Sequence, residues 1–259
     1  MSFACIDGTV IHYRYRAGAG LPIVFLNSLG TDFRIWDGVV ARLPAGLPLL
    51  LMDKPGHGLS QTAPTTMEGY ARTVAGLMDH CGLDRALVCG VSIGGMIAQT
   101  LALSHPGKVA GLILSNTAAK LGDAQSWQDR LGTLDRVGLE GMADAVLERW
   151  FSGRFRTERP VELEGYRAML TRTPAEGYAT ACAAISDTDL RERIGGIDVP
   201  TLCLAGSDDL ASPPEVVHGL ASAIPGATCK DIEGVGHLPM IEAPEVVAEA
   251  LLDHYARLT

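Results

Sequence analysis

Basic residues are what this sequence most clearly lacks. Its 21 Lys and Arg are scattered, without a cluster, and 30 Asp and Glu outnumber them, which gives a formal net charge of −9 at pH 7. A protein that binds nucleic acid needs a basic surface to release counterions, and an anionic membrane attracts the same kind of surface. Neither a nucleic acid nor a membrane is therefore expected as a partner.

The chain also lacks the cysteine and histidine patterns of metal and redox sites. None of its six cysteines stands in a Cys-x-x-Cys pair, and no His-Glu-x-x-His sequence occurs. These absences argue against a zinc site, a thioredoxin-like site and a disulfide framework. Cys89 and Cys203 lie in hydrophobic runs, where a free cysteine acts as a small buried hydrophobe. The sequence thus predicts a protein without a metal or a cofactor.

Signals for secretion or membrane insertion are missing as well. Residues 1–7 contain no basic residue and no long hydrophobic run, so no signal peptide is expected and we expect a cytoplasmic protein. Residues 86–104 carry no charge and are long enough to span a bilayer. However, Gly90, Gly94 and Gly95 stand between a strand-like run and a helix-like run there. This pattern predicts a buried strand, a turn and a helix.

Hydrophobic runs that alternate with helical segments are abundant. Of the 259 residues, 47% are hydrophobic, which is enough for a large core in one or two domains. Continuous hydrophobic runs are typical of strands covered on both faces, as in a parallel sheet. The alternation therefore predicts an α/β fold, with a mainly parallel sheet and helices on both faces. The expected strands are 22–27, 49–53, 86–91, 111–114 and 201–205, with a half-exposed edge strand at 11–16; the expected helices are 67–80, 96–103, 214–223 and 244–257.

The alternation stops in the stretch 121–194. This stretch has no clear strand pattern, but residues 144–150 and 162–170 have helical patterns. We therefore expect residues 1–120 and 195–259 to form the core of the fold. Residues 121–194 are expected to form a helical cap inserted between two core strands.

Gly90-Val-Ser-Ile-Gly94 is a G-x-S-x-G sequence between an expected buried strand and an expected helix. A nucleophilic serine needs this context, because the flanking glycines allow a sharp turn from strand to helix. Ser92 is therefore the predicted nucleophile. The amide of Ile93, at the start of the helix, is a predicted donor to the oxyanion. A second donor is expected from the loop after an adjacent strand, where the amide of Leu29 is the candidate.

A serine hydroxyl becomes a good nucleophile only when a base removes its proton. Among the seven histidines, His237 fits best, because it lies in a glycine-rich loop after the run 227–232. His57, between two glycines after the expected strand 49–53, is the competing candidate.

The third member of such a triad is a carboxylate that orients the imidazole. Asp208 and Asp209 follow the expected strand 201–205. Two adjacent aspartates cannot both point inward, and chemistry alone does not choose between them. The resulting order of nucleophile, acid and base along the chain belongs to one fold among the unrelated folds that carry this triad.

Over nearly its whole length the sequence resembles the α/β-hydrolase family and, within it, the 3-oxoadipate enol-lactone hydrolases. The catalytic motifs mark only the larger family. The narrower resemblance rests on Asn27-Ser-Leu-Gly-Thr-Asp32 and Ser115-Asn-Thr-Ala-Ala119. In the insertion, Ala143-Asp-Ala-Val-Leu-Glu-Arg-Trp-Phe151 is similar too.

Two details of the larger family bear on the triad. Its acid loop usually reads Gly-x-x-Asp-x-x-x-Pro, and matching Gly206 and Pro213 to this pattern selects Asp209 over Asp208. His237 is followed by Glu242 and a proline, as in that family.

The resemblance implies hydrolysis of 3-oxoadipate enol-lactone to 3-oxoadipate by the triad, in the bacterial breakdown of protocatechuate or catechol. The substrate is then a small anionic lactone, whose buried carboxylate needs a cationic or hydrogen-bonding partner. The candidates are Arg34, close after the oxyanion loop, and Arg130 in the cap. Trp127 and Trp150 are expected either to line the pocket or to fill the core of the cap.

Two other hypotheses remain open at this stage. The same fold and triad can serve another substrate, such as a small ester, a carbon–carbon bond or a peracid, and a substrate panel separates these. The chain can also be a ligand-sensing protein that keeps the hydrolase shell, in which case a single turnover leaves a stable complex. The sequence predicts no oligomeric state.

Overall fold

The computed structural model describes residues 2–259; Met1, the first residue of the expected core, lies outside the described part. The centre is an eight-stranded sheet in the order β1-β2-β4-β3-β5-β6-β7-β8. β2 pairs antiparallel with β1 and β4, and the other pairs are parallel, so the expected α/β fold is confirmed. The strands are β1 (Ser2–Ile6), β2 (Thr9–Arg16), β3 (Ile23–Leu26), β4 (Leu49–Met52), β5 (Ala86–Val91), β6 (Val109–Ser115), β7 (Thr201–Gly206) and β8 (Thr228–Ile232).

The central strands are buried as their composition predicts. Every residue of β3, β4, β5 and β6 is buried, because helices cover both faces of the sheet. β1 is not among the expected strands. It has only five residues at the edge of the sheet, and Ser2, Phe3 and Cys5 among them are exposed.

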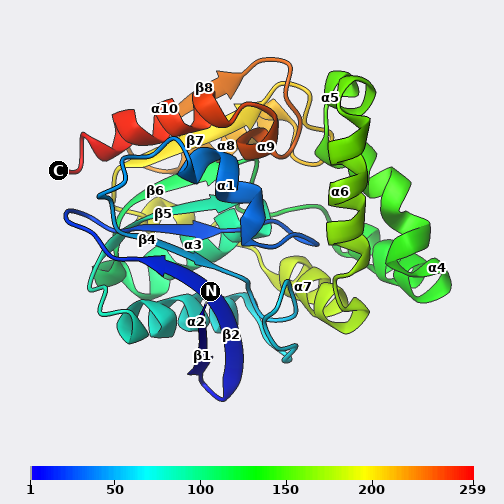
Figure 1. Ribbon diagram of the computed structural model, residues 1–259, viewed down its shortest axis with the longest axis horizontal. Coiled ribbons are helices and arrows are strands. Elements are labelled where there is room, and N and C mark those ends of the chain that lie inside the picture. Colours follow the sequence, from blue (N-terminus) through cyan, green and yellow to red (C-terminus); the bar gives the residue numbers. More distant parts are fainter. Residues whose placement is uncertain (1) are drawn as a thin grey trace.

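Helices lie on both sides of the sheet (Figure 1). On one side, α2 (Met67–His80) packs against α3 (Ile93–Ser104), and on the other, α1 (Asp37–Val40) packs against α10 (Pro244–Tyr255). The remaining helices of the core are α8 (Pro214–Ala223), α9 (Pro239–Glu242) and the 3-10 helices η1 (Phe33–Trp36), η2 (Pro106–Lys108) and η3 (Ile194–Gly196).

Four helices follow one another between β6 and β7, within the stretch expected to form the cap. They are α4 (Ala124–Trp150), α5 (Gly153–Glu158), α6 (Pro160–Thr171) and α7 (Ala175–Asp187). They stand at one end of the sheet (Figure 1). α4 is not straight, because Gly138 has a φ of 66° and a ψ of 179° and divides it into two segments. Such a left-handed φ favours glycine.

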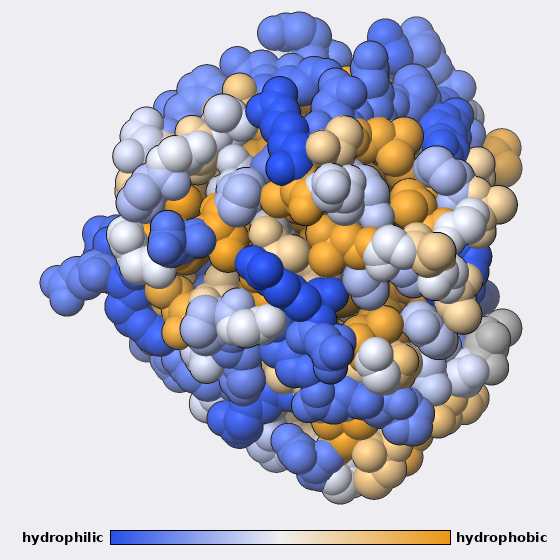
Figure 2. Space-filling view, turned by 90° about the vertical axis from the view of Figure 1, so that its left-hand side faces the viewer, coloured by the Kyte–Doolittle hydropathy of each residue, from blue (hydrophilic) through white to orange (hydrophobic). Residues whose placement is uncertain are grey.

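The cap lies over the loops that follow the parallel strands. Gly30, after β3, lies against Trp150 and Tyr178, and Gly236, after β8, lies against the backbone around Trp150. The face turned away from the cap shows hydrophilic residues around scattered hydrophobic ones (Figure 2). Between residues 2 and 259, no helix has both the length and the hydrophobicity of a membrane span.

Candidate active site

Ser92 stands on the turn between β5 and α3, with a φ of 57° and a ψ of −122°. This is a strained conformation for a residue with a Cβ. The glycines around it are sterically required, since a Cβ on Gly90 would collide with the Gly94 carbonyl, and a Cβ on Gly94 with the Leu26 carbonyl. Thr117 holds the turn from outside, because its hydroxyl donates to the Ser92 carbonyl at 2.7 Å.

Two backbone amides beside this turn are free to bind an oxyanion. The amides of Ile93, at the start of α3, and of Leu29 have no hydrogen-bond acceptor within residues 2–259. Leu29 and Ser92 line the same cavity. A developing negative charge there would meet unpaired N–H groups and the positive end of a buried helix.

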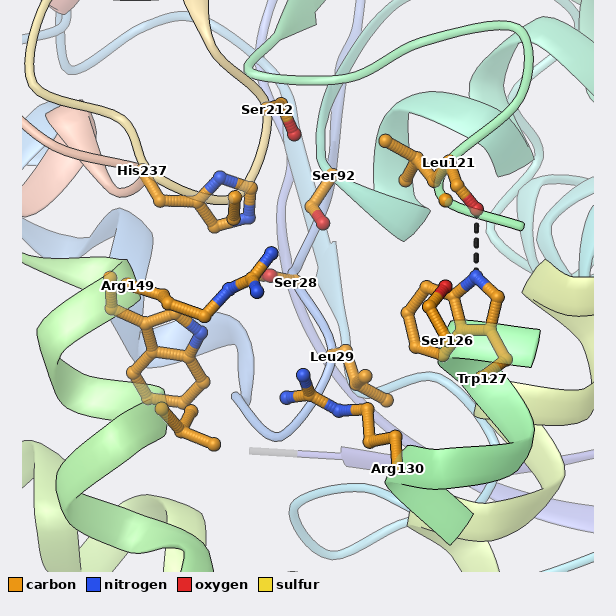
Figure 3. A pocket seen from close by; sticks show the side chains of 14 residues that line it. Ser28, Leu29, Ser92, Leu121, Ser126, Trp127, Arg130, Arg149, Ser212 and His237 are labelled. Carbon is orange, nitrogen blue, oxygen red and sulfur yellow. Dashed lines mark hydrogen bonds between the residues drawn. The ribbon is translucent and has the colours of Figure 1, made fainter. Parts of the chain in front are cut away.

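His237 and Asp209 form a buried pair beneath the cap. Nδ1 of His237 lies 2.9 Å from Oδ2 of Asp209, and each residue is only 2% exposed. Asp208 is exposed and accepts a hydrogen bond from Ser207, so of the two candidate acids it is Asp209 that the structure brings to His237. Ser92, which is 8% exposed, lines the same cavity as His237, and the two side chains face a common space (Figure 3).

Both oxygens of the Asp209 carboxylate accept hydrogen bonds. Oδ2 also accepts from Asn116 Nδ2 at 2.8 Å, and Oδ1 accepts from the amides of Ala211 and Ser212 at 2.6 and 3.0 Å. Burial opposes ionisation, but His237, Asn116 and the Ser212 amide together lower the pKa of Asp209 below its usual value. A charged Asp209 fixes the proton of His237 on Nδ1, which leaves Nε2 free to accept the proton of Ser92.

The loop that carries His237 is tied to the end of α4. The His237 amide donates to the Trp150 carbonyl at 2.9 Å. Glu242 accepts from the Gly236 amide at 2.8 Å and from the amide and hydroxyl of Ser152 at 3.1 and 2.5 Å. Partial burial raises the pKa of this carboxyl group. The position of the His237 imidazole therefore depends on how the cap packs against the core.

A cavity of about 150 Å³ opens between the triad and the cap. Figure 3 shows the guanidinium groups of Arg149 and Arg130 reaching into the same space as Ser92 and His237. Of the described residues that line the cavity, none is acidic. The lining residues are Ser28, Leu29, Ser92, Leu121, Gly122, Ser126, Trp127, Arg130, Val146, Arg149, Trp150, Ala211, Ser212 and His237.

Three of the four predicted substrate-binding residues lie in this cavity. Arg130 packs between Trp127 and Tyr178, with its Cζ 5.7 and 5.6 Å from their ring centroids, and its Nε donates to the Tyr178 hydroxyl at 2.9 Å. Trp127 is anchored through Nε1, which donates to the Leu121 carbonyl at 2.7 Å. Trp150 is buried, so it belongs both to the lining and to the core of the cap.

Arg34 is not in the site, contrary to the prediction. Its side chain is 64% exposed and forms a salt bridge with Asp32, which also accepts from the Arg34 amide as the cap of η1. It lines a different cavity, of about 330 Å³, which shares no lining residue with the cavity of Ser92 and His237. A neighbouring acidic partner therefore holds Arg34 away from Ser92. His57 is not in the catalytic cavity either; it is fully buried, and burial keeps its pKa well below the usual value.

Arg149 is not among the residues predicted from the sequence to bind the substrate. Partial burial and the charge of Arg130 lower its pKa. Within residues 2–259 its guanidinium has no hydrogen-bond or salt-bridge partner, although it points into the cavity (Figure 3). Arg149 directly precedes Trp150, a predicted pocket residue, and this is the sequence feature that could have indicated it.

Comparisons with known proteins identify the family of the chain. A family model described as the alpha/beta hydrolase fold matches residues 22–244, and the chain belongs to this family of hydrolases. Among curated relatives, 3-oxoadipate enol-lactonase 2 of Acinetobacter baylyi is 32% identical over 231 residues, which cover 88% of this chain and 86% of the relative.

Solved structures give a similar result. The enol-lactonase from Burkholderia xenovorans LB400 superposes with a TM-score of 0.95 at 36% identity, over 98% of this chain and 100% of that one. A thermophilic esterase from Thermogutta terrifontis, in a malate-bound form, superposes with a TM-score of 0.93 at 28% identity, over 100% of this chain and 99% of that one. The chain is thus similar both to lactonases and to an esterase.

Proposed function

We propose that this protein hydrolyses 3-oxoadipate enol-lactone to 3-oxoadipate, in the breakdown of aromatic compounds. The observation that carries the proposal is the charge of the catalytic cavity. Arg130 and Arg149 line it together with Ser92, and none of the described lining residues is acidic. Such a cavity favours a substrate with a carboxylate over a neutral ester, and the lactonases among the relatives agree with this choice.

The reaction begins when Ser92 Oγ attacks the lactone carbonyl and His237 Nε2 takes the hydroxyl proton. Asp209 stabilises the imidazolium that forms, while the amides of Leu29 and Ile93 bind the tetrahedral oxyanion. The bond between the carbonyl carbon and the ring oxygen then breaks. His237 returns its proton to the departing enol oxygen, which remains attached to the acyl-enzyme through the opened ring.

Water completes the cycle. His237 takes a proton from a water molecule, whose oxygen attacks the acyl carbon, and the ester bond to Ser92 Oγ breaks as the proton returns to it. The released enol isomerises to the ketone in solution. No electrons are exchanged with an external partner, so the chemistry needs only these side chains and water.

Arg149 is the residue that we expect to hold the substrate carboxylate. Arg149→Met should lower kcat/KM for the lactone by about 10- to 100-fold, mainly through KM, because a charge-assisted hydrogen bond is worth about 1.5–3 kcal/mol. Hydrolysis of neutral 4-nitrophenyl acetate should change less than about threefold, since that ester has no carboxylate to lose. Arg34→Met is the matched control, because it removes a guanidinium outside the cavity, and it should change neither rate. An equal loss on both substrates would contradict a carboxylate contact.

The proposed function itself is tested by steady-state rates of the purified protein. We expect multiple turnovers of authentic 3-oxoadipate enol-lactone, with kcat/KM about 100-fold or more above that for 4-nitrophenyl acetate, from two cationic contacts that the ester lacks. A preference for the neutral ester, or for another substrate class, would assign the cavity to a different reaction of the same triad. A single turnover that ends in a stable complex would favour a ligand sensor.

A further inference from the structure

A buried lysine lies directly behind the oxyanion loop. Lys54 follows β4, and the register of β3 with β4 places Leu26 opposite Met52, so that the loops after the two strands leave the sheet side by side. Lys54 is only 3% exposed, and its Nζ donates to the Ser28 carbonyl at 2.5 Å. Among residues 2–259, no carboxylate lies within salt-bridge distance of this ammonium group.

The contact between Lys54 and the Ser28 carbonyl matters because this carbonyl is bonded to the Leu29 amide. That carbonyl and the Leu29 amide belong to a single planar peptide group, and residues 2–259 contain no cis peptide bond. In a trans peptide the C=O and N–H bonds point in opposite directions. A cation that binds the Ser28 oxygen from behind therefore aims the Leu29 N–H toward the cavity. It also polarises the peptide, which makes that N–H a stronger donor.

We propose that Lys54 is a positioning residue of the oxyanion hole, which orients and polarises the Leu29 amide through the Ser28 carbonyl. This assignment rests on the proposed role of Leu29 in acyl transfer, but not on the identity of the substrate.

The energetic cost of the arrangement supports a functional role. Burial lowers the pKa of Lys54 to about 7, against the opposing influence of Asp53 and Asp32. The fold therefore gains nothing from charging this group. The Ser28 carbonyl does not need it either, because the hydroxyl and the amide of Thr31 also donate to it, at 2.9 and 3.3 Å. A costly buried cation on an already satisfied acceptor is typical of a site where function overrides stability.

Lys54→Met tests the proposal, because methionine fills a similar volume without the charge. With 4-nitrophenyl acetate as the probe, we expect kcat to fall about 10-fold or more, with KM changed less than about threefold and the melting temperature not lowered. Lys120→Met is the matched control. The Lys120 Nζ also donates to a backbone carbonyl, that of Ser186, at 2.5 Å, but Lys120 does not line the cavity. Its kcat should stay within about twofold of the wild-type value.

If Lys54 only stabilises the loop that carries Ser28, we expect a different result. Unchanged kcat in Lys54→Met, an effect confined to KM, or a loss of kcat that matches a loss of melting temperature would overturn the proposal. If Lys54→Met does not fold, Lys54→Gln, which keeps a polar N–H but no charge, must show the same loss of kcat. Because the neutral ester reports on any acyl transfer at Ser92, the result stands even if the protein does not prefer the lactone.

Discussion

Ser92→Ala should lower kcat for the lactone by about three to six orders of magnitude. Ser92 is the cavity hydroxyl that stands on the turn before α3, next to the free Ile93 amide, so the variant loses the nucleophile at the oxyanion site. The free amides and the cationic cavity remain, and they set the residual rate. The fold should survive, because alanine keeps the Cβ and so meets the same strain at a φ of 57° as serine does. Steady-state rates and thermal unfolding of the two proteins measure these effects.

The control for this variant lies at the other end of α3. Ser104 donates its hydroxyl to the Thr100 carbonyl at 2.7 Å and does not line the cavity. Ser104→Ala should therefore keep the wild-type kcat. Near-normal lactone hydrolysis by Ser92→Ala would mean that the reaction does not pass through an acyl-enzyme on this residue.

The turn that carries Ser92 was predictable because its signals are local. A continuous hydrophobic strand, a G-x-S-x-G turn and a helix stand next to one another in the sequence, and steric requirements link them directly. The same locality explains why the buried strands were found. β1 was not found; it lies at the edge of the sheet, and three of its five residues are exposed. The choice between Asp208 and Asp209 is different. It depends on which carboxylate faces a histidine 28 positions later, and only the resemblance selected it.

The cationic residues of the cavity show where sequence reasoning fails. Arg130 and Arg149 both belong to α4, and in a straight helix their separation of 19 positions would place them about 28 Å apart. The break at Gly138 instead lets the two halves of α4 flank one cavity (Figure 3). Arg34 is the opposite case. It is close to the oxyanion loop in sequence, but its bond to Asp32 turns it toward another cavity.

The ties between the cap and the His237 loop could not be read from the sequence either. Glu242 entered only as part of a family motif, yet it bridges Gly236 and Ser152, which are 84 positions apart along the chain. Through this carboxylate and the Trp150 carbonyl, the helix that carries Arg149 also holds the loop that carries the base. The positions of Arg149 and of the imidazole are therefore mechanically linked.

Asp209→Asn should lower kcat by about three to four orders of magnitude while the fold remains. The asparagine oxygen can keep both backbone donors, the amides of Ala211 and Ser212. Its NH2 group then replaces Oδ2, the atom that faces His237 Nδ1. Because an NH2 group can only donate, it forces the imidazole proton onto Nε2. The ring can then no longer accept the proton of Ser92. The Asn116 amide, which donates to Oδ2 in the wild type, must also turn away from the new NH2 group.

Asp208→Asn makes the same chemical change one residue earlier, on an exposed side chain that accepts a hydrogen bond from Ser207. Its kcat should stay within about twofold of the wild-type value. Both variants lose one negative charge from neighbouring residues. A difference in kcat between them therefore reports on the position of that charge and not on its loss. If both variants were equally impaired, the general field of the acidic loop would matter more than the tautomer of His237. If neither were impaired, the imidazole would not need a carboxylate to hold its proton. A large loss confined to Asp209→Asn is the result that the buried geometry requires.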